Sequence, residues 1–197
     1  MGGSNKKNGR QLLLQTGRTL FWKYGVRRIS VEEVCKSAGV SKMTFYRSFE
    51  NKEDLAFQVL KGFITEGMDS YRAVMKQDIP FREKIAKVIA LKHQQSVDIS
   101  QEFIQEIYQS TDSVLSAYIE ESRKEMLSEI MYDLFMAQQN GWIRRDTKLE
   151  FILYMLNSLN DKMMDERFLS MYEDKHDAIM DLTNFFFYGI FPSEQPE

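Results

Sequence analysis

Cysteine and histidine are scarce in this chain of 197 residues, which has one cysteine, Cys35, and two histidines, His93 and His176. A single cysteine excludes an intramolecular disulfide framework and leaves no cluster of thiolates to bind a metal. An enzyme would need a convergent set of catalytic groups, and the sequence has neither a glycine-rich phosphate loop nor metal-ligand spacing. We therefore expect no catalysis, no cofactor and no metal site.

Long apolar runs are also absent. The densest apolar segment, Leu182 to Phe191, is about half of the ~20 residues that a helix needs to cross a bilayer. The first nine residues are basic but lack the hydrophobic core of a signal peptide. These two absences predict a soluble protein of the cytoplasm, associated with the nucleoid if it binds DNA, with no membrane partner.

Only three prolines occur, and no segment alternates apolar and polar residues with a period of two, so the sequence predicts an all-α fold. We expect helices over residues 9–24, 30–38, 41–49, 51–75, 81–97, 101–109, 113–140, 148–164 and 172–188. Asn140-Gly141 is compatible with a hairpin turn, but the helical spacing on both sides favours a helix end.

Charge is distributed very unevenly along the chain. The whole chain has a net charge of -3, whereas residues 1–52 contain 11 Lys or Arg against 3 Asp or Glu, a local charge of +8. Residues 53–197 contain 15 against 26, a charge of -11. A basic N-terminal part on an acidic body is typical of a nucleic-acid reader joined to a second module.

The segment Ser30–Lys52 predicts two short helices joined by a tight turn, with a third helix directly afterwards. Ser30 and Glu33 have the spacing of a capping box, which satisfies the free amides at a helix start. Gly39 can adopt the left-handed conformation that ends this helix. Ser41 can then cap the second helix.

The second of these helices has one apolar and one polar face. Phe45 and Phe49 lie one turn apart and are expected to point inward. The other faces carry Lys42, Met43, Thr44, Tyr46 and Arg47. A short helix with such a face suits the major groove of DNA. A helical hairpin with a merely solvated face is the alternative, and the charge distribution favours the DNA-binding interpretation.

The segment 9–59 resembles the TetR (AcrR-like) family of bacterial transcription regulators. The resemblance is carried by the helix end Leu20-Phe-Trp-Lys-Tyr-Gly25, by Ala38-Gly-Val-Ser-Lys42, by the aromatic pair Phe45-Tyr46 and by the capped start Asn51-Lys-Glu-Asp54. It implies an N-terminal helix-turn-helix DNA-binding domain over residues 1–52 and a helical effector-binding and dimerisation domain over 53–197. The fourth helix, residues 51–75, would link the two domains.

The resemblance also implies a set of DNA-binding residues. The residues carried over are Arg27, Arg28, Ser30, Ser41, Lys42, Met43, Thr44, Tyr46, Arg47 and Lys52. Ser30, Thr44, Tyr46 and Lys52 match positions that touch phosphates, whereas Lys42 and Met43 match positions that face the groove. Amides at the helix starts add donors.

Two residues of the second short helix depart from the family pattern. Arg47 replaces a frequent histidine and can bond either a guanine edge or a phosphate. Met43 replaces a frequently small residue and can either pack on a thymine methyl group or merely adjust the fit. Lys6, Lys7 and Arg10 can form an arm that follows the DNA backbone, or a disordered basic tail.

For the acidic body the resemblance implies a homodimer and an effector pocket. Two apolar stripes on the last helices predict the dimer interface at Leu149, Ile152, Leu153, Leu156, Ile179, Leu182 and Phe186. The same stripes can instead close the core of a monomer. A pocket between the fifth and seventh helices would draw on His93, Phe103, Tyr108, Tyr118 and Met126, which are equally suited to an ordinary core.

The expected function is that of a ligand-responsive transcription regulator. We expect a repressor that binds a palindromic double-stranded DNA operator as a dimer and is released by a small, largely apolar effector, with the fourth helix as the lever. The alternative is a DNA-anchored adaptor whose acidic body binds another protein rather than a small molecule. A large enclosed apolar cavity would favour the effector, and a filled core with an exposed apolar patch would favour the adaptor.

Overall fold

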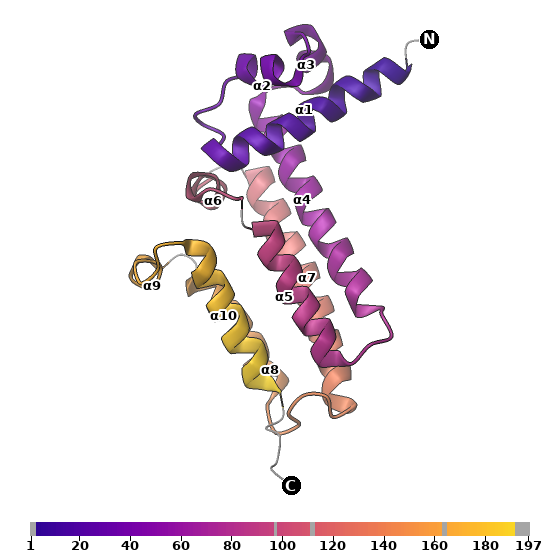
Figure 1. The fold of residues 1–197 in the computed structure, drawn as a ribbon, viewed down its shortest axis with the longest axis vertical. Helices are drawn as coiled ribbons and strands as arrows, with labels where there is room; N and C mark the ends of the chain where they lie inside the picture. Colours follow the sequence, from indigo (N-terminus) through magenta and orange to yellow (C-terminus); the bar gives the residue numbers. More distant parts are fainter. Residues whose placement is uncertain (1–2, 97, 111–112, 163–164, 192–197) are drawn as a thin grey trace. The chain divides into compact units, whose positions relative to one another are not determined.

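The computed structural model describes residues 3–96, 98–110, 113–162 and 165–191, and this part of the chain forms ten helices and no strand (Figure 1). The predicted all-α fold is confirmed. The helices are α1 (Gly3–Tyr24), α2 (Val31–Ala38), α3 (Lys42–Ser48), α4 (Lys52–Met75), α5 (Phe81–Ser96), α6 (Gln101–Tyr108), α7 (Ser113–Gln139), α8 (Leu149–Lys162), α9 (Glu166–Leu169) and α10 (Lys175–Ile190).

Most helix ends lie within a few residues of the predicted ones. The short helix α9 was not predicted, and it begins where the Asp165 side chain accepts a hydrogen bond from the Arg167 amide at 3.1 Å. The helix predicted from residue 172 begins at Lys175 instead. Helix α7 ends at Gln139 and Gly141 has φ +74°, so Asn140-Gly141 is a helix end, as expected.

The chain divides into two compact units. The N-terminal unit comprises residues 1–66 and 98–119, and the C-terminal unit comprises residues 67–97 and 120–197. Helices α4 and α7 therefore contribute residues to both units. The predicted functional boundary between residues 52 and 53 remains a prediction, because a compact unit is not a functional domain.

Helix α1 organises the core of the N-terminal unit, since it contacts α2, α3 and α6. Leu13 and Phe21 from α1 are completely buried, together with Phe45 from α3 and Leu55 from α4. Phe103 brings α6 into the same core, with its ring centroid 5.8 Å from that of Trp22. Segments far apart in the sequence thus hold the three N-terminal helices in place.

A second apolar core lies in the C-terminal unit, where α10 packs against α5. Leu134, Ile143 and Ile152 are almost completely buried in it. Phe81 at the start of α5 stacks on Trp142 in the loop after α7, with ring centroids 5.8 Å apart. Among the described helices, none is long and apolar enough to cross a membrane.

Candidate nucleic-acid interface

The capping box at the start of α2 is present as predicted. The Ser30 amide donates to Glu33 Oε2 at 2.7 Å, and the Glu33 amide donates back to Ser30 Oγ at 3.2 Å. The Ser30 hydroxyl makes a further bond to the same carboxylate at 2.8 Å. These hydrogen bonds lower the pKa of the Glu33 carboxyl, and the bond from the Ser30 backbone amide has the largest effect. An ionised Glu33 therefore fixes the entry to α2.

The turn between α2 and α3 depends on Gly39, whose φ of +65° is the left-handed conformation predicted for it. The Val40 amide then donates to the Cys35 carbonyl at 3.0 Å and closes the helix end. Ser41 caps α3 by accepting a hydrogen bond from the Thr44 amide at 3.2 Å. Helix α3 thus starts two residues after α2 has been closed.

Helix α3 buries one face and exposes the other. Phe45 and Phe49 are buried in the core of the N-terminal unit. Met43 is 78% exposed and Tyr46 is 60% exposed, although apolar side chains of this size are usually covered. Arg47 is exposed beside them. This face can therefore reach into a groove as far as its side chains extend.

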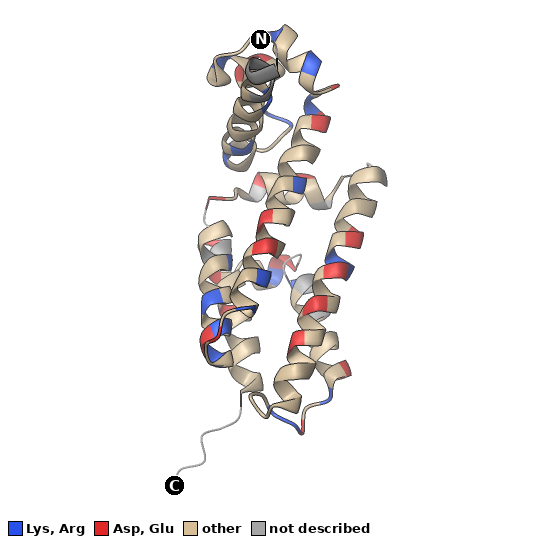
Figure 2. Cartoon of the chain, turned by 90° about the vertical axis from the view of Figure 1, so that its right-hand side faces the viewer, with Lys and Arg blue, Asp and Glu red and all other residues tan. Residues whose placement is uncertain are grey.

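Two of the predicted cations, Lys42 and Lys52, make hydrogen bonds within the chain. Lys42 pairs with Glu32 of α2, and this hydrogen bond raises the pKa of the Lys42 ammonium group. Lys52 donates from Nζ to the Arg27 carbonyl at 3.3 Å. Figure 2 shows where the charged residues lie along the ribbon. A contact between Lys42 and DNA would replace its contact with Glu32.

All ten residues expected to bind DNA lie in the N-terminal unit. Arg27 and Arg28 are in the loop before α2, Ser30 and Ser41 are N-caps, five residues are on α3, and Lys52 begins α4. Their contacts with DNA remain predictions. The side chains of Lys6 and Lys7 lie outside the described residues, whereas Arg10 stacks over the Phe49 ring at 5.2 Å.

Sequence reasoning missed two acidic residues of this unit. Glu32 has a weak signal, since it precedes Glu33 in the first turn of α2 and could have been paired with a lysine on α3. Glu106 on α6 had no signal, because it hydrogen-bonds backbone amides about 80 residues earlier in the chain. Both carboxylates contact residues predicted to bind DNA.

Three of the five residues predicted to line an effector pocket have described side chains. Phe103 is 3% exposed in the core of the N-terminal unit. Tyr118 packs its ring against Phe57 in the same unit, with centroids 5.3 Å apart. Met126 is half-buried on α7 in the C-terminal unit. The side chains of His93 and Tyr108 lie outside the described residues.

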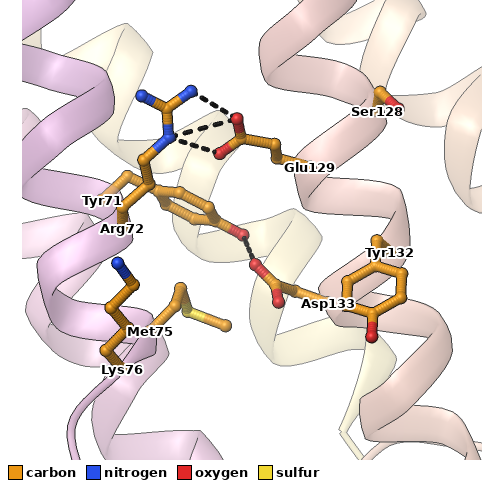
Figure 3. A pocket seen from close by; sticks show the side chains of 8 residues that line it. All are labelled: Tyr71, Arg72, Met75, Lys76, Ser128, Glu129, Tyr132 and Asp133. Carbon is orange, nitrogen blue, oxygen red and sulfur yellow. Dashed lines mark hydrogen bonds and ion pairs between the residues drawn. The ribbon is translucent and has the colours of Figure 1, made fainter.

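A groove of about 430 Å³ lies between α4 and α7 in the C-terminal unit (Figure 3). Arg72 donates from Nε to both oxygens of Glu129, at 2.9 and 3.1 Å, and from Nη2 to Glu125 at 2.9 Å. Tyr71 donates its hydroxyl proton to Asp133 at 2.8 Å. Burial, followed by this hydrogen bond, raises the pKa of Tyr71. The polar groups of this groove thus join α4 to α7.

Two of the predicted interface residues are core residues instead. Ile152 is 1% exposed and Phe186 is 6% exposed within the core of the C-terminal unit, so neither can present its side chain to a partner. Leu149, Leu153, Ile179 and Leu182 are half-buried, and the Leu156 side chain lies outside the described residues. The outward faces of α8 and α10 carry other large side chains, namely Phe151, Tyr154, Phe185 and Tyr188.

Comparison with known proteins places these features in context. The family model described as "Bacterial regulatory proteins, tetR family" matches residues 13–59, which span the second half of α1, all of α2 and α3, and the first part of α4. The HTH-type transcriptional repressor KstR2 of Rhodococcus jostii is 25% identical over 158 residues, which cover 78% of this chain and 76% of that protein.

Two solved structures show the same fold at low sequence identity. A TetR-family transcriptional regulator from Cytophaga hutchinsonii has a TM-score of 0.73 at 14% identity, covering 98% of this chain and 100% of that one. The fatty acid degradation regulator FadR from Bacillus halodurans has a TM-score of 0.68 at 16% identity, covering 92% and 95%. The likeness extends over both compact units.

Proposed function

We propose that this chain, which belongs to the TetR family of bacterial regulatory proteins, is a repressor that binds a palindromic operator as a homodimer. We further propose that a small, largely apolar effector releases it from DNA. The chain is a helix-turn-helix transcription regulator by its family.

The exposed face of α3 is the observation that carries the proposal. Its N-terminus is capped by Ser41, its inner face is anchored by Phe45, and its outer face exposes Met43 and Arg47. A short, rigidly anchored helix with a basic and apolar outer face suits base edges and thymine methyl groups in the major groove. The relative KstR2, which is named a repressor, supports the direction of regulation.

The exposed aromatic residues of α8 and α10 support a homodimer. Phe185 is 79% exposed and Tyr154 is 68% exposed, and large aromatic side chains are enriched at protein interfaces. A twofold dimer would place one copy of α3 in each half of a palindrome. The half-site spacing would then follow from the dimer geometry.

The links between α4 and α7 support a response to a ligand. Arg72 and Tyr71 tie the distal part of α4 to Glu129 and Asp133. Helix α4 continues from there to Lys52, beside the DNA-binding residues. A ligand that favours a different arrangement of α4 and α7 would shift the equilibrium between DNA-binding and released states. The twelve methionines and 13% aromatic residues suit an adaptable apolar site.

An adaptor that binds another protein is the second candidate, and one observation favours it. Tyr132 is 65% exposed on α7, next to Phe135 at 42% and Met136 at 39%. Exposed apolar residues clustered on one segment mark interaction surfaces in soluble proteins. This cluster would present a docking site for a partner if no effector were found.

Selection of DNA from a random-sequence library by the full-length protein tests the proposal. We expect enriched duplexes to share an inverted repeat whose half-sites are separated by whole helical turns. Light scattering should give the mass of a dimer for the free protein. Enrichment of single half-sites by a monomer would contradict the dimeric repressor. A screen of apolar compounds that never releases the selected duplex would leave the adaptor as the better account.

A further inference from the structure

A carboxylate from a distant helix holds the turn between α1 and α2. Glu106 of α6 accepts a hydrogen bond from the Val26 amide at 2.5 Å and from the Arg27 amide at 3.1 Å, both at Oε2. Its other oxygen lies 3.3 Å from the same Arg27 amide. Successive amides that converge on one anion form a small concave site, which the Glu106 carboxylate fills.

Gly25 brings the backbone close enough for this contact. It ends α1 with φ +77°, and its amide donates to the Phe21 carbonyl at 2.8 Å. A Cβ atom at position 25 would lie only 2.8 Å from Glu106 Oε1, closer than real Cβ contacts allow. The chain and the carboxylate are therefore in direct contact on this side of the turn.

Lys52 also holds this turn, through the carbonyl group of Arg27. The Lys52 ammonium donates to the Arg27 carbonyl at 3.3 Å, while the Arg27 amide is bound by Glu106. Both backbone polar groups of Arg27 are thus occupied, and its side chain remains exposed. Arg28, which is also exposed, follows directly. These contacts hold the backbone from which the Arg27 and Arg28 side chains leave, and the Arg28 guanidinium also lies over the Tyr24 ring, 5.6 Å from its centroid.

Glu106 belongs to a segment with an unusual position in the chain. Residues 98–119 are part of the N-terminal unit, although the residues before and after them in sequence belong to the C-terminal unit. Helix α6 packs on α1 through Phe103, which touches the Trp22 ring. The turn is therefore held by a helix of the N-terminal unit whose two chain connections both lead to residues of the C-terminal unit.

We propose that Glu106 is a positioning residue for DNA binding. It fixes the backbone of the turn that presents Arg27 and Arg28, and it does so without touching DNA itself. This inference rests on the proposed function only in that it assigns Arg27 and Arg28 to the DNA surface. The direction of the change in DNA affinity distinguishes positioning from charge. Electrostatics alone predicts that removing a negative charge from a DNA-binding protein raises its affinity for DNA. Loss of positioning should lower it.

Fluorescence anisotropy with a labelled duplex recovered from the random library measures this effect. We expect Glu106→Ala to weaken binding about tenfold, the equivalent of one charge-assisted hydrogen bond. Glu106→Gln keeps one acceptor oxygen and should fall between the wild type and Glu106→Ala. Glu121→Ala is the matched control, since this exposed carboxylate lies on α7 in the other unit and its loss changes the net charge equally.

A double-mutant comparison separates positioning from a general loss of structure. In a protein that already carries Arg27→Ala and Arg28→Ala, Glu106→Ala should weaken binding further by less than about twofold, because the groups that it positions are gone. An equal loss in both backgrounds would overturn the proposal. So would unchanged or tighter binding by Glu106→Ala alone.

Amide hydrogen exchange of the full-length wild-type protein tests the contact without any mutation. The Val26 and Arg27 amides should exchange at least about tenfold more slowly than exposed loop amides, and Glu106→Ala should remove this protection while leaving α1 protected. Fast exchange of both amides in the wild type would refute the proposal that Glu106 holds this turn, even if Glu106→Ala fails to fold. If the wild type enriches no duplex, the proposed function fails, and the exchange result still decides whether Glu106 holds the turn.

Discussion

Arg47 has the guanidinium group best placed to read sequence, because it is exposed on the outer face of α3 and no contact holds it within the described part of the chain. If it bonds a guanine edge, Arg47→Ala should weaken operator binding by about 1–3 kcal/mol and relax the preference at one base pair per half-site. Anisotropy titrations with the selected duplex and with a scrambled duplex measure both quantities.

Lys52→Ala provides the comparison for Arg47. As a phosphate contact, Lys52 should contribute equally to all sequences, so its loss should lower the salt slope of binding without changing base preference. If Arg47→Ala weakens the selected and scrambled duplexes to the same extent, Arg47 binds a phosphate and does not read a base.

Glu33 makes the N-terminus of α2 sensitive to acid. Its pKa is lowered in the folded protein, so the stability gained from ionised Glu33 is present above its ordinary pKa of 4.5 and is lost as the pH falls through the lowered value. The difference in unfolding free energy between the wild type and Glu33→Gln, measured in urea, should therefore be larger at pH 7 than at pH 3. A difference that does not change with pH would show that only the shape of the side chain matters.

At the scale of single residues, the sequence predicted local contacts well and distant ones poorly. The capping box of Ser30 and Glu33 and the left-handed Gly39 require partners only a few residues away, so their spacing is visible in the chain. Glu106 depends on how α6 meets the turn after α1. No periodicity encodes that pairing, because it arises from packing between segments about 80 residues apart.

The pairing of α4 with α7 is the element-scale feature with the clearest consequence for stability. Tyr71 on α4 is half-buried and donates its hydroxyl proton to Asp133 on α7. Tyr71→Phe should lower the free energy of unfolding by about 1 kcal/mol at pH 8, because Asp133 loses a hydrogen bond. Tyr132→Phe is the control, since Tyr132 lines the same groove and is 65% exposed.

The same pair should weaken in alkali. Because the pKa of Tyr71 is raised above its ordinary value of 10, its stabilisation is complete below pH 10 and is lost as the pH rises toward the folded-state value. The advantage of the wild type over Tyr71→Phe should thus shrink between pH 8 and pH 11 in urea unfolding. An advantage that stays constant over this range would contradict a stabilising hydrogen bond from the protonated Tyr71 hydroxyl.

Whole helices were predicted more reliably than their roles. Apolar spacing located the long helices because each buries one continuous face. Helix α9 has only four residues and buries no side chain, so its sequence has no apolar spacing by which to predict it. The stripes of α8 and α10 were recognised, but Ile152 and Phe186 face the chain's own core. A stripe shows that a face is apolar, and only the packed structure shows what covers it.

At the scale of the molecule, the exposed aromatic residues of α8 and α10 should decide the oligomeric state. Phe185→Glu places a charge on the proposed interface. It should weaken the free energy of dimerisation by about 2 kcal/mol, which raises the dimer dissociation constant roughly thirtyfold. Sedimentation velocity over a range of concentrations measures it. Met171→Glu is the control, because Met171 is 75% exposed but lies outside both helices. Equal dissociation of the two variants would argue against this interface.

The discontinuous N-terminal unit has a consequence for synthesis and for protein engineering. A nascent chain that ends at residue 66 already contains α1, α2 and α3, but it lacks Phe103 to cover Trp22 and lacks Glu106 to hold the Val26 and Arg27 amides. We therefore expect the N-terminal unit to complete its folding only after the ribosome has passed residue 119. A chimaera that joins residues 1–66 to the C-terminal part of another protein would contain an incomplete N-terminal unit. A chimaera that also includes residues 98–119 would contain the complete unit.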